Sequence, residues 1–292
     1  MPAKPKPIFE SRCVYTLHSE ELSSSQCFRK SNNPMEMREW ATRILGADTL
    51  EEKLFCPDEL TDFAPGPAQF WKEPSRPPGM AFQRHSKKEK LPAFHEHREQ
   101  DNRAVCLHRF AGHELLAVEI MAHALVAFPE APARFRKGVA NTLREEQEHV
   151  RLYIERMGEL GLKFGDLPLY RHFWAHIPYL TSPIRYISVV SLTFEMANLD
   201  FAPMYGQSFA RVGDVESAAL MQRILEDEIS HVSFGWNWLK KMKSPEISEW
   251  DAWEQNLPPL MTPKRAKGFI VFEDHRKQAG IPQEWIDKLK LF

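Results

Sequence analysis

The sequence has little of what marks membrane or secreted proteins. No run of about 18 apolar residues is present, so we expect no membrane span and no membrane partner. The first residues lack the apolar segment of a signal peptide. The cysteines are far apart and form no Cys-x-x-Cys pair, which predicts reduced thiols in the cytoplasm rather than a disulfide framework. They are Cys13, Cys27, Cys56 and Cys106.

An excess of charge of one sign is also lacking. Lys and Arg total 38 against 40 for Asp and Glu, a formal net charge of -2. The overall charge therefore indicates neither a nucleic-acid partner nor an anionic membrane as a partner. The basic runs KKEK (87–90) and KRAK (264–267) are short, and such runs usually serve solubility. Hydrophobic residues make up 43% of the chain and charged residues 27%, as is ordinary for a globular protein.

What the sequence does contain is a set of long helical patterns. The apolar-rich run 115–128, interrupted by Glu119 and His123, predicts a buried core helix. Stop signals and caps divide residues 101–244 into four helical stretches. We predict them at Asn102–Phe128, Ala131–Glu159, Pro183–Val212 and Val215–Lys243.

The connections between these stretches are short, long and short. This is the connectivity of an all-α four-helix bundle with one crossover between the second and third helices. Residues 1–100 are rich in Pro, Ser, Lys and Glu, and we expect an irregular N-terminal arm that packs on the bundle, with short helices near Asn33–Leu45 and Thr49–Leu54. Residues 245–292 are expected to form a C-terminal tail with a short helix at Pro282–Lys290.

The segment REEQEHVRLY (144–153) carries a Glu-x-x-His pair, Glu146 and His149, which project from nearly the same side of a helix. The segment EDEISHVSF repeats this pair as Glu228 and His231. A carboxylate-bridged dimetal site takes Glu-x-x-His from two helices of a bundle and one Glu from each of the others. Glu114 precedes Glu146 by 32 residues and Glu195 precedes Glu228 by 33, so the two halves of the chain repeat each other. We predict six metal ligands, which are also the predicted catalytic residues: Glu114, Glu146, His149, Glu195, Glu228 and His231.

Each half has a further acid, Glu119 or Asp200, five residues after its lone glutamate. Five residues turn a helix by about 500°, so both acids of a half cannot face one metal without a helix irregularity. We therefore interpret Glu119 and Asp200 as structural acids or, together with Asp227, as acceptors for the outer ring nitrogens of the ligand histidines. Glu119 and His123, four residues apart, can also pair with each other.

Other residues near the Glu-x-x-His pairs have weaker signals. Tyr153, seven residues after Glu146, returns to the same helix face and is predicted to line the pocket. Glu145 and Glu148 are predicted to lie on the solvated or outer face of that helix. The alternative to a metal site is a set of buried salt bridges between the acids and the arginines Arg144, Arg151 or Arg223.

Four carboxylates and two imidazoles form a hard, mostly oxygen donor set. Such a set favours iron or manganese and argues against a structural zinc ion. We expect two metal ions, Fe/Fe first, with Fe/Mn or Mn/Mn as alternatives. Six side chains leave open positions on two metals, where dioxygen can bind as co-substrate.

These motifs resemble the ferritin-like superfamily of dimetal carboxylate proteins over residues 101–243. More narrowly, the chain is similar to a bacterial family of unknown function within that superfamily. The segments that carry the resemblance include LHRFAGHELLAVEIMAHALVAFPEAP (107–132), EEQEHVRLYIERMGELG (145–161) and EMANLDFAP (195–203).

The resemblance implies a non-haem diiron, oxygen-activating oxidoreductase, a hydroxylase or oxidase of a small-molecule or peptide-like substrate. It would need an external electron donor. A metal-handling or peroxide-scavenging protein like ferritin or rubrerythrin is the alternative, although rubredoxin-like cysteine pairs are missing. A tRNA-modifying hydroxylase ranks lower, because only analogy supports an RNA partner. The sequence is compatible with a homodimer.

Overall fold

The computed structural model describes residues 34–83 and 90–292. Residues 31–292 form one compact unit, and the other unit, Met1–Lys30, lies outside the described residues. Cys13, Cys27, most of the KKEK run and the beginning of the predicted arm also lie outside them. The two described cysteines, Cys56 and Cys106, are free thiols.

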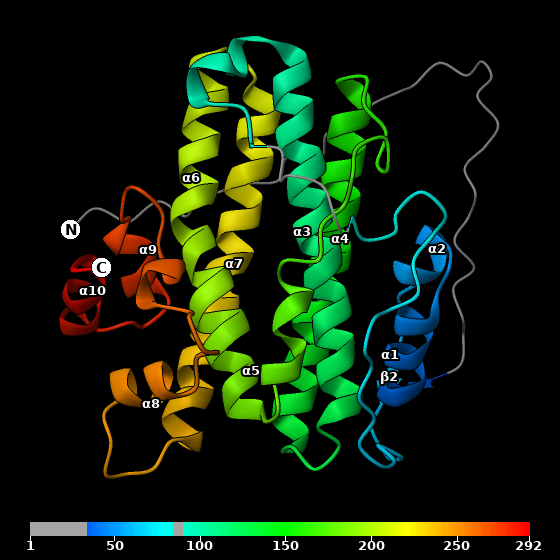
Figure 1. Ribbon diagram of the computed structural model, residues 1–292, viewed down its shortest axis with the longest axis vertical. Helices are drawn as coiled ribbons and strands as arrows, with labels where there is room; N and C mark the ends of the chain where they lie inside the picture. Colours follow the sequence, from blue (N-terminus) through cyan, green and yellow to red (C-terminus); the bar gives the residue numbers. More distant parts are fainter. Residues whose placement is uncertain (1–33, 84–89) are drawn as a thin grey trace, which may run out of the picture. The chain divides into compact units, whose positions relative to one another are not determined.

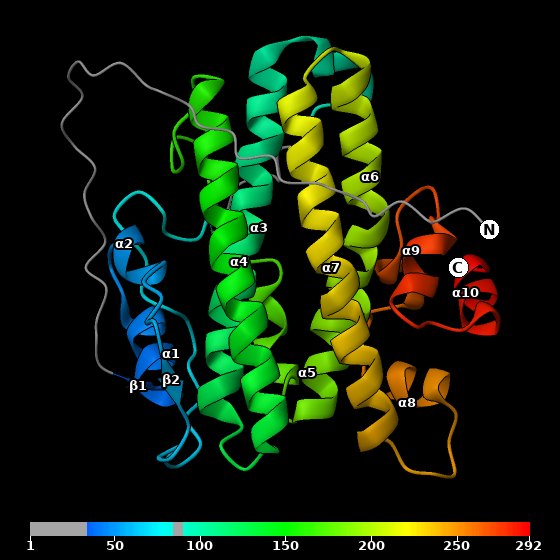
Figure 2. The same cartoon turned by 180° about the vertical axis from the view of Figure 1, so that it is seen from behind.

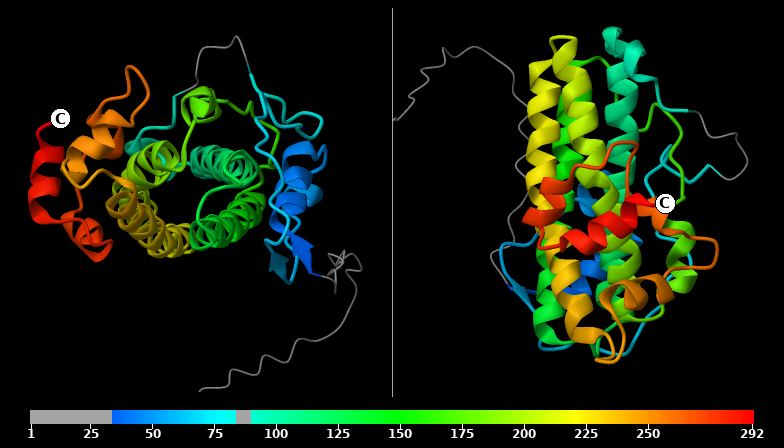
Figure 3. Two further views of the ribbon diagram at one scale, coloured as in Figure 1. Left: turned by 90° about the horizontal axis from the view of Figure 1, so that it is seen from below. Right: turned by 90° about the vertical axis from the view of Figure 1, so that its left-hand side faces the viewer.

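The described chain is mostly helical, and four long helical segments lie side by side (Figures 1 and 2). They are α3 (Gln100–Ala127), α4 (Ala133–Glu159), a segment made of α5 (Pro183–Val189), a π-helix (Val190–Glu195) and α6 (Met196–Arg211), and α7 (Val215–Met242). α3 packs along α4, and α6 packs along α7, as the end-on view of Figure 3 shows. The predicted helical stretch Pro183–Val212 is present over Pro183–Arg211, and a π-helix, which the sequence did not indicate, lies within it.

Local chemistry sets where these helices begin. The side chain of Ser182 accepts a hydrogen bond from the amide of Arg185 at 3.4 Å, and Pro183 follows as the first helical residue of α5. Asp214 caps α7 by accepting from the amide of Ser217 at 3.0 Å. Gly213, with φ of 85°, makes the tight turn before this cap, a conformation that favours glycine.

Helix α3 is the core helix of the described chain. By length and composition it is apolar enough to cross a membrane, but 89% of its most apolar window is buried inside the protein. The expected buried helix over 115–128 is confirmed by this burial. Its apolar character is used for packing against α4 and α1.

The N-terminal region is more regular than predicted. Strand β1 (Met35–Glu36) pairs in parallel with β2 (Leu60–Thr61), which the sequence did not indicate. The two expected short helices are present as α1 (Met37–Gly46) and α2 (Leu50–Lys53), and a 3₁₀ helix, Phe94–Arg98, leads into α3. α1 packs on α3, and its Trp40 is fully buried.

The C-terminal region also contains more helix than predicted. The expected last helix is α10 (Gln283–Lys290), and two further helices, α8 (Glu249–Gln255) and α9 (Glu273–Gln278), precede it. A short 3₁₀ helix, Pro263–Ala266, lies between them in the chain and packs on the π-helix. These elements lie on the α6–α7 side of the four segments, opposite α1 and α2 (Figures 1 and 3).

Two buried acids anchor these flanking regions to the long helices. Glu119 on α3 forms ion pairs with Lys53, at 2.9 Å, and with Arg76. Asp200 on α6 pairs with Arg276 at 2.6 Å and accepts from the amides of Gly268 and Phe272, both at 2.8 Å. All of these charged side chains are almost completely buried. Burial makes each ion pair a constraint on where the arm and the tail can lie.

This arrangement corrects part of the prediction for Glu119 and Asp200. Their carboxylates do not accept hydrogen bonds from the ligand histidines, because they bind cations of the flanking regions. Glu119 and Asp200 are therefore structural acids, which was the other role predicted for them. The suggested Glu119–His123 pair is wrong for the same reason. The ring of His123 instead packs against Phe70 and Trp174.

Replacing Asp200 by asparagine tests the anchor of the tail. Asp200→Asn leaves the guanidinium of Arg276 buried without its counter-charge, so we expect the free energy of unfolding to fall by about 3 kcal/mol. Urea denaturation measures it. The control is Asp287→Asn on α10, whose partner Lys290 is solvent-exposed and whose loss should cost less than about 1 kcal/mol. Equal losses in both variants would contradict the anchoring role.

Candidate metal centre

The structure brings the six predicted ligands together between the four long segments. Their candidate ligand atoms fall into two groups, and within each group all atoms lie within 4.8 Å of one another. Both groups contain Glu146, so they are adjacent and share one carboxylate. The first group consists of Glu114, Glu146, His149 and Glu228, and the second of Glu146, Glu195 and His231; all of these side chains are buried.

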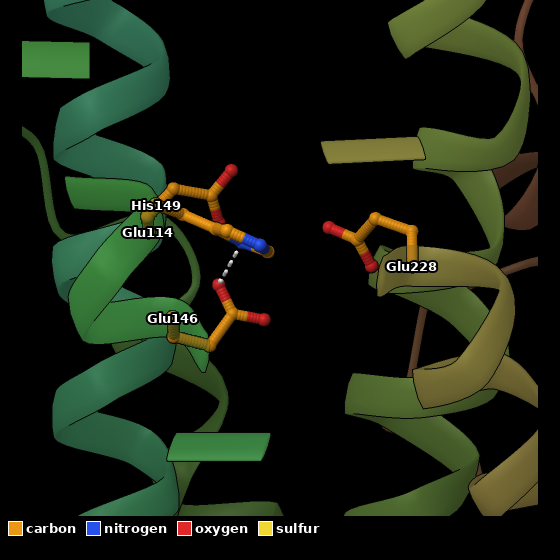
Figure 4. A group of neighbouring side chains, drawn as sticks. All are labelled: Glu114, Glu146, His149 and Glu228. Atoms are coloured by element: carbon orange, nitrogen blue, oxygen red, sulfur yellow. Dashed lines mark hydrogen bonds and ion pairs between the residues drawn. The ribbon is translucent and has the colours of Figure 1, made fainter. Parts of the chain in front are cut away.

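Helix geometry aims these side chains at one point. In Figure 4, Glu114 from α3 and Glu146 and His149 from α4 face Glu228 across the interior. The Nδ1 atom of His149 lies 3.3 Å from Oε2 of Glu146. On the opposite side, Nδ1 of His231 lies 3.2 Å from Oε1 of Glu146 and 3.6 Å from Oε2 of Glu228. Both imidazoles therefore turn Nδ1 toward the carboxylates.

The other nitrogen of each imidazole is held from outside the cluster. His149 Nε2 lies 3.1 Å from Oδ2 of Asp227, and His231 Nε2 lies 2.7 Å from Oε2 of Glu145. Each acid belongs to the helix opposite its histidine, so the two contacts cross between α4 and α7. In the neutral form of each imidazole, an Nε2–H that donates to the carboxylate leaves the lone pair of Nδ1 available to a metal.

Glu145 was predicted to lie on the solvated face of α4 or to contact a ligand from outside, but its partner His231 was not predicted. Its side chain is 46% exposed, in line with the expected solvated face, and yet it binds His231. The repeat contained the signal, because Glu145 and Asp227 each stand directly before the glutamate of a Glu-x-x-His pair. Glu148 is exposed on α4 and pairs with Arg151 at 3.2 Å.

Further polar side chains lie against the cluster. Asn198, one turn after Glu195 on α6, donates from Nδ2 to Oε1 of Glu228 at 2.8 Å. Tyr153 is buried, and its hydroxyl donates to the sulfur of Met221 at 3.7 Å. Burial raises the pKa of Tyr153 well above its usual value, and the neighbouring carboxylates of Glu114 and Glu228 raise it further. The phenol therefore stays protonated beside the acids.

The electrostatics of the cluster is dominated by burial of like charges. Burial raises the pKa of Glu114 well above its usual value, and the carboxylates of Glu146 and Glu228 add to the shift. Burial also raises the pKa of Glu195 to about 8, and the opposing effect of His231 does not cancel it.

Glu146 behaves in the opposite way. Burial disfavours its charged form, but hydrogen bonds from His149 and His231 outweigh burial and hold its pKa below the usual range. The same carboxylate and Asp227 outweigh the burial of His149 and raise the pKa of that imidazole to about 9. A cluster of this kind favours either protons or cations as its counter-charge.

The donor set fits metal ions better than it fits salt bridges. Among the residues that the structure describes, both oxygens of Glu195 and Oε2 of Glu228 are buried without a hydrogen-bond donor, although the Ser191 hydroxyl lies close enough to lower the pKa of Glu195. Leaving a buried acceptor unsatisfied costs about 1–3 kcal/mol, and a bound cation removes that cost. The buried Glu/His cluster can therefore hold metal ions.

The arginines of the salt-bridge alternative have other partners. Arg144 donates to the carbonyl of Pro57 at 2.8 Å, and Arg223 pairs with Asp227 at 3.1 Å. Arg151 pairs with Glu148 and donates to the carbonyl of Leu54. Each of these contacts lies outside the buried carboxylates.

The chain belongs to the family described as "Protein of unknown function (DUF455)", whose sequence profile matches residues 32–287. No curated protein and no solved structure matches the chain. The matched range includes the arm and the tail as well as the four long segments, so the flanking regions are part of what defines the family.

Removing Glu195 tests the division into two metal positions. Glu195 belongs to the second group alone, so we expect Glu195→Ala to bind one metal ion where the unchanged protein binds two. Elemental analysis after loading with iron or manganese measures the metal content per chain. Glu148→Ala removes an exposed glutamate from α4 and should keep both ions; two ions in Glu195→Ala would show that the third-segment ligand is misassigned.

Replacing Asp227 tests the outer contact to His149. Asp227→Asn weakens the acceptor for His149 Nε2, so we expect the affinity of the first ligand group for a metal ion to fall by about 10- to 100-fold. A competition titration against a chelator of known affinity measures the change. Arg223→Gln removes the exposed partner of Asp227 without touching His149 and serves as the control. An affinity loss shared by the two variants would argue against the proposed contact.

Proposed function

We propose that the protein is a non-haem dimetal oxidoreductase of the ferritin-like superfamily, acting as a hydroxylase or oxidase of an organic substrate with dioxygen as co-substrate. The observation that carries this proposal is the pair of ligand groups that share Glu146 inside four helical segments. The short, long and short connections between those segments support a ferritin-like bundle with one crossover.

The donor set favours two iron ions, with Fe/Mn or Mn/Mn as alternatives. Four carboxylates can balance the charge of two divalent ions, and oxygen-rich sets suit iron and manganese better than zinc. Glu114, His149 and Glu228 would help to hold one ion and Glu195 and His231 the other, with Glu146 belonging to both groups. Two ferrous ions held in this way would supply electrons for the reduction of dioxygen.

The residues around the cluster control the orientation of its ligand side chains. Asp227 and Glu145 fix the ring planes of the histidines, and Asn198 fixes the carboxylate of Glu228. These contacts preset the ligand geometry before any substrate arrives. A preset geometry is what a redox site needs to accommodate changes of charge with little rearrangement.

Aromatic side chains of the crossover between α4 and α5 cover the outer side of α3 and the π-helix. The ring of His172 packs edge-on against His113 with centroids 4.7 Å apart, and Phe173 stacks on Phe194 at 4.4 Å. His113 and Phe194 directly precede the ligands Glu114 and Glu195. A cover of half-buried rings on the side that carries the lone glutamates would limit the access of water there, and it supports oxidation of an organic substrate over simple metal storage.

The free thiols Cys56 and Cys106 are in line with the reducing, cytoplasmic location that we propose. An external electron donor would be required, because the described residues include no Cys-x-x-Cys pair for a second redox centre. The described part of the chain offers no specific observation in favour of an RNA substrate.

A reaction with dioxygen tests the proposed function. Protein loaded anaerobically with ferrous ions should consume dioxygen in proportion to its bound iron pairs and faster than free ferrous ions do. An oxygen electrode combined with iron analysis measures both quantities. Glu195→Ala should lose the fast phase and Glu148→Ala should keep it. Accumulation of iron far beyond a pair per chain would favour storage instead, and a bound pair without fast consumption would refute the oxidase proposal while leaving the metal site intact.

A further inference from the structure

Glu195 is the last residue of the π-helix Val190–Glu195. A π-turn contains one extra residue, and such turns are rare because the wider ring weakens backbone hydrogen bonding. Backbone carbonyls near the turn must find other donors, since unpaired buried groups are costly. The groups that supply these donors also decide where Glu195 lies.

The carbonyl of Ser188, just before the π-helix, has two side-chain donors. It accepts from the hydroxyl of Thr193, at 2.7 Å, and from the indole nitrogen of Trp253, at 3.1 Å. The same indole N–H lies 3.2 Å from the Thr193 oxygen, so the three groups form one closed network. Trp253 is fully buried and belongs to α8, far along the chain in the C-terminal tail.

Helix α7 accommodates the same turn from the other side. A Cβ atom on Gly235 would lie 2.3 Å from Cβ of Ser191, a residue of the π-helix. Glycine costs about 1 kcal/mol in a helix interior relative to alanine, and this close approach explains its presence there. The π-turn is therefore held between a glycine on α7 and a tryptophan from the tail.

We propose that Trp253 is a positioning residue of the metal centre: its indole N–H, together with the Thr193 hydroxyl, holds the π-turn that presents Glu195 to the second metal position. The C-terminal tail thereby takes part in the metal centre and does more than cover the outside of α6 and α7. The inference rests on the metal pair of the proposed function but not on any reaction with dioxygen.

Packing must be separated from hydrogen bonding in the test. Trp253 also contacts the rings of Trp250 and Trp285, with centroids 5.0 and 4.9 Å away. Trp253→Phe keeps an aromatic ring in this cluster and removes the indole N–H. Trp250→Phe is the matched control, because the indole of Trp250 donates along its own helix, to Glu254 at 3.2 Å, and has no other acceptor among the described residues.

The experiment is a manganese titration followed by electron paramagnetic resonance, which distinguishes a coupled metal pair from a single ion. We expect Trp253→Phe to weaken binding of the second ion by about 10-fold, with loss of the pair signal at limiting manganese. Hydrogen exchange of the amides of 190–195 should become faster in the metal-free protein. Trp250→Phe should retain the pair signal and the slow exchange.

A second pair of variants covers the case in which Trp253→Phe does not fold. Thr193→Val removes the hydroxyl from the same network and should lose the second ion, whereas Thr193→Ser restores the hydroxyl and should keep it. Wild-type affinity and exchange in Trp253→Phe or Thr193→Val, or an equal loss in Trp250→Phe, would overturn the inference alone. Failure of the unchanged protein to bind a manganese or iron pair would overturn the metal centre itself.

Discussion

Burial of four carboxylates close together is the constraint on which the rest of the structure depends. Charged oxygens lose their hydration in the helix interior, and each raises the cost of ionising its neighbours. This cost raises the pKa values of Glu114 and Glu195. The pKa of Glu146 is lowered instead, because it accepts hydrogen bonds from the two imidazoles beside it. An interior of this kind is stable only with counter-charges at its centre, which is why a cation site explains the cluster better than a packing accident does.

The two halves of the internal repeat contribute equally to this buried cluster. Each half contributes one lone glutamate, one Glu-x-x-His pair and an acid that crosses to the histidine of the other half. The repeat extends to the outer acids, because Glu119 and Asp200 occupy equivalent positions and each binds a cation of a flanking region. The same helix position thus anchors the arm in one half and the tail in the other.

The sequence predicted what depends on spacing along one helix and could not predict what depends on distant partners. Glu-x-x-His repeated at a matching distance from Glu114 and Glu195 was enough to place the six residues of the cluster. The role of Asp200 depended on Arg276, which lies far along the chain and has no periodic relation to it. The π-turn could not be predicted either, because it depends on a hydrogen bond from the distant Trp253 and on the absence of a side chain at Gly235. Helices α8 and α9 were missed because their patterns are only a few residues long.

The buried ion pairs of Glu119 and Asp200 have a consequence for what counts as a folding unit here. The sequence pattern divides the chain into arm, bundle and tail, as though the four long segments were a module with appendages. Excising that module would remove Lys53 and Arg276 from the two carboxylates, and each carboxylate that stays buried without its cation would cost about 3–5 kcal/mol, much of a domain's net stability. The smallest part of this protein that can fold alone therefore includes the arm and the tail. It corresponds to the whole region that the family profile matches, residues 32–287.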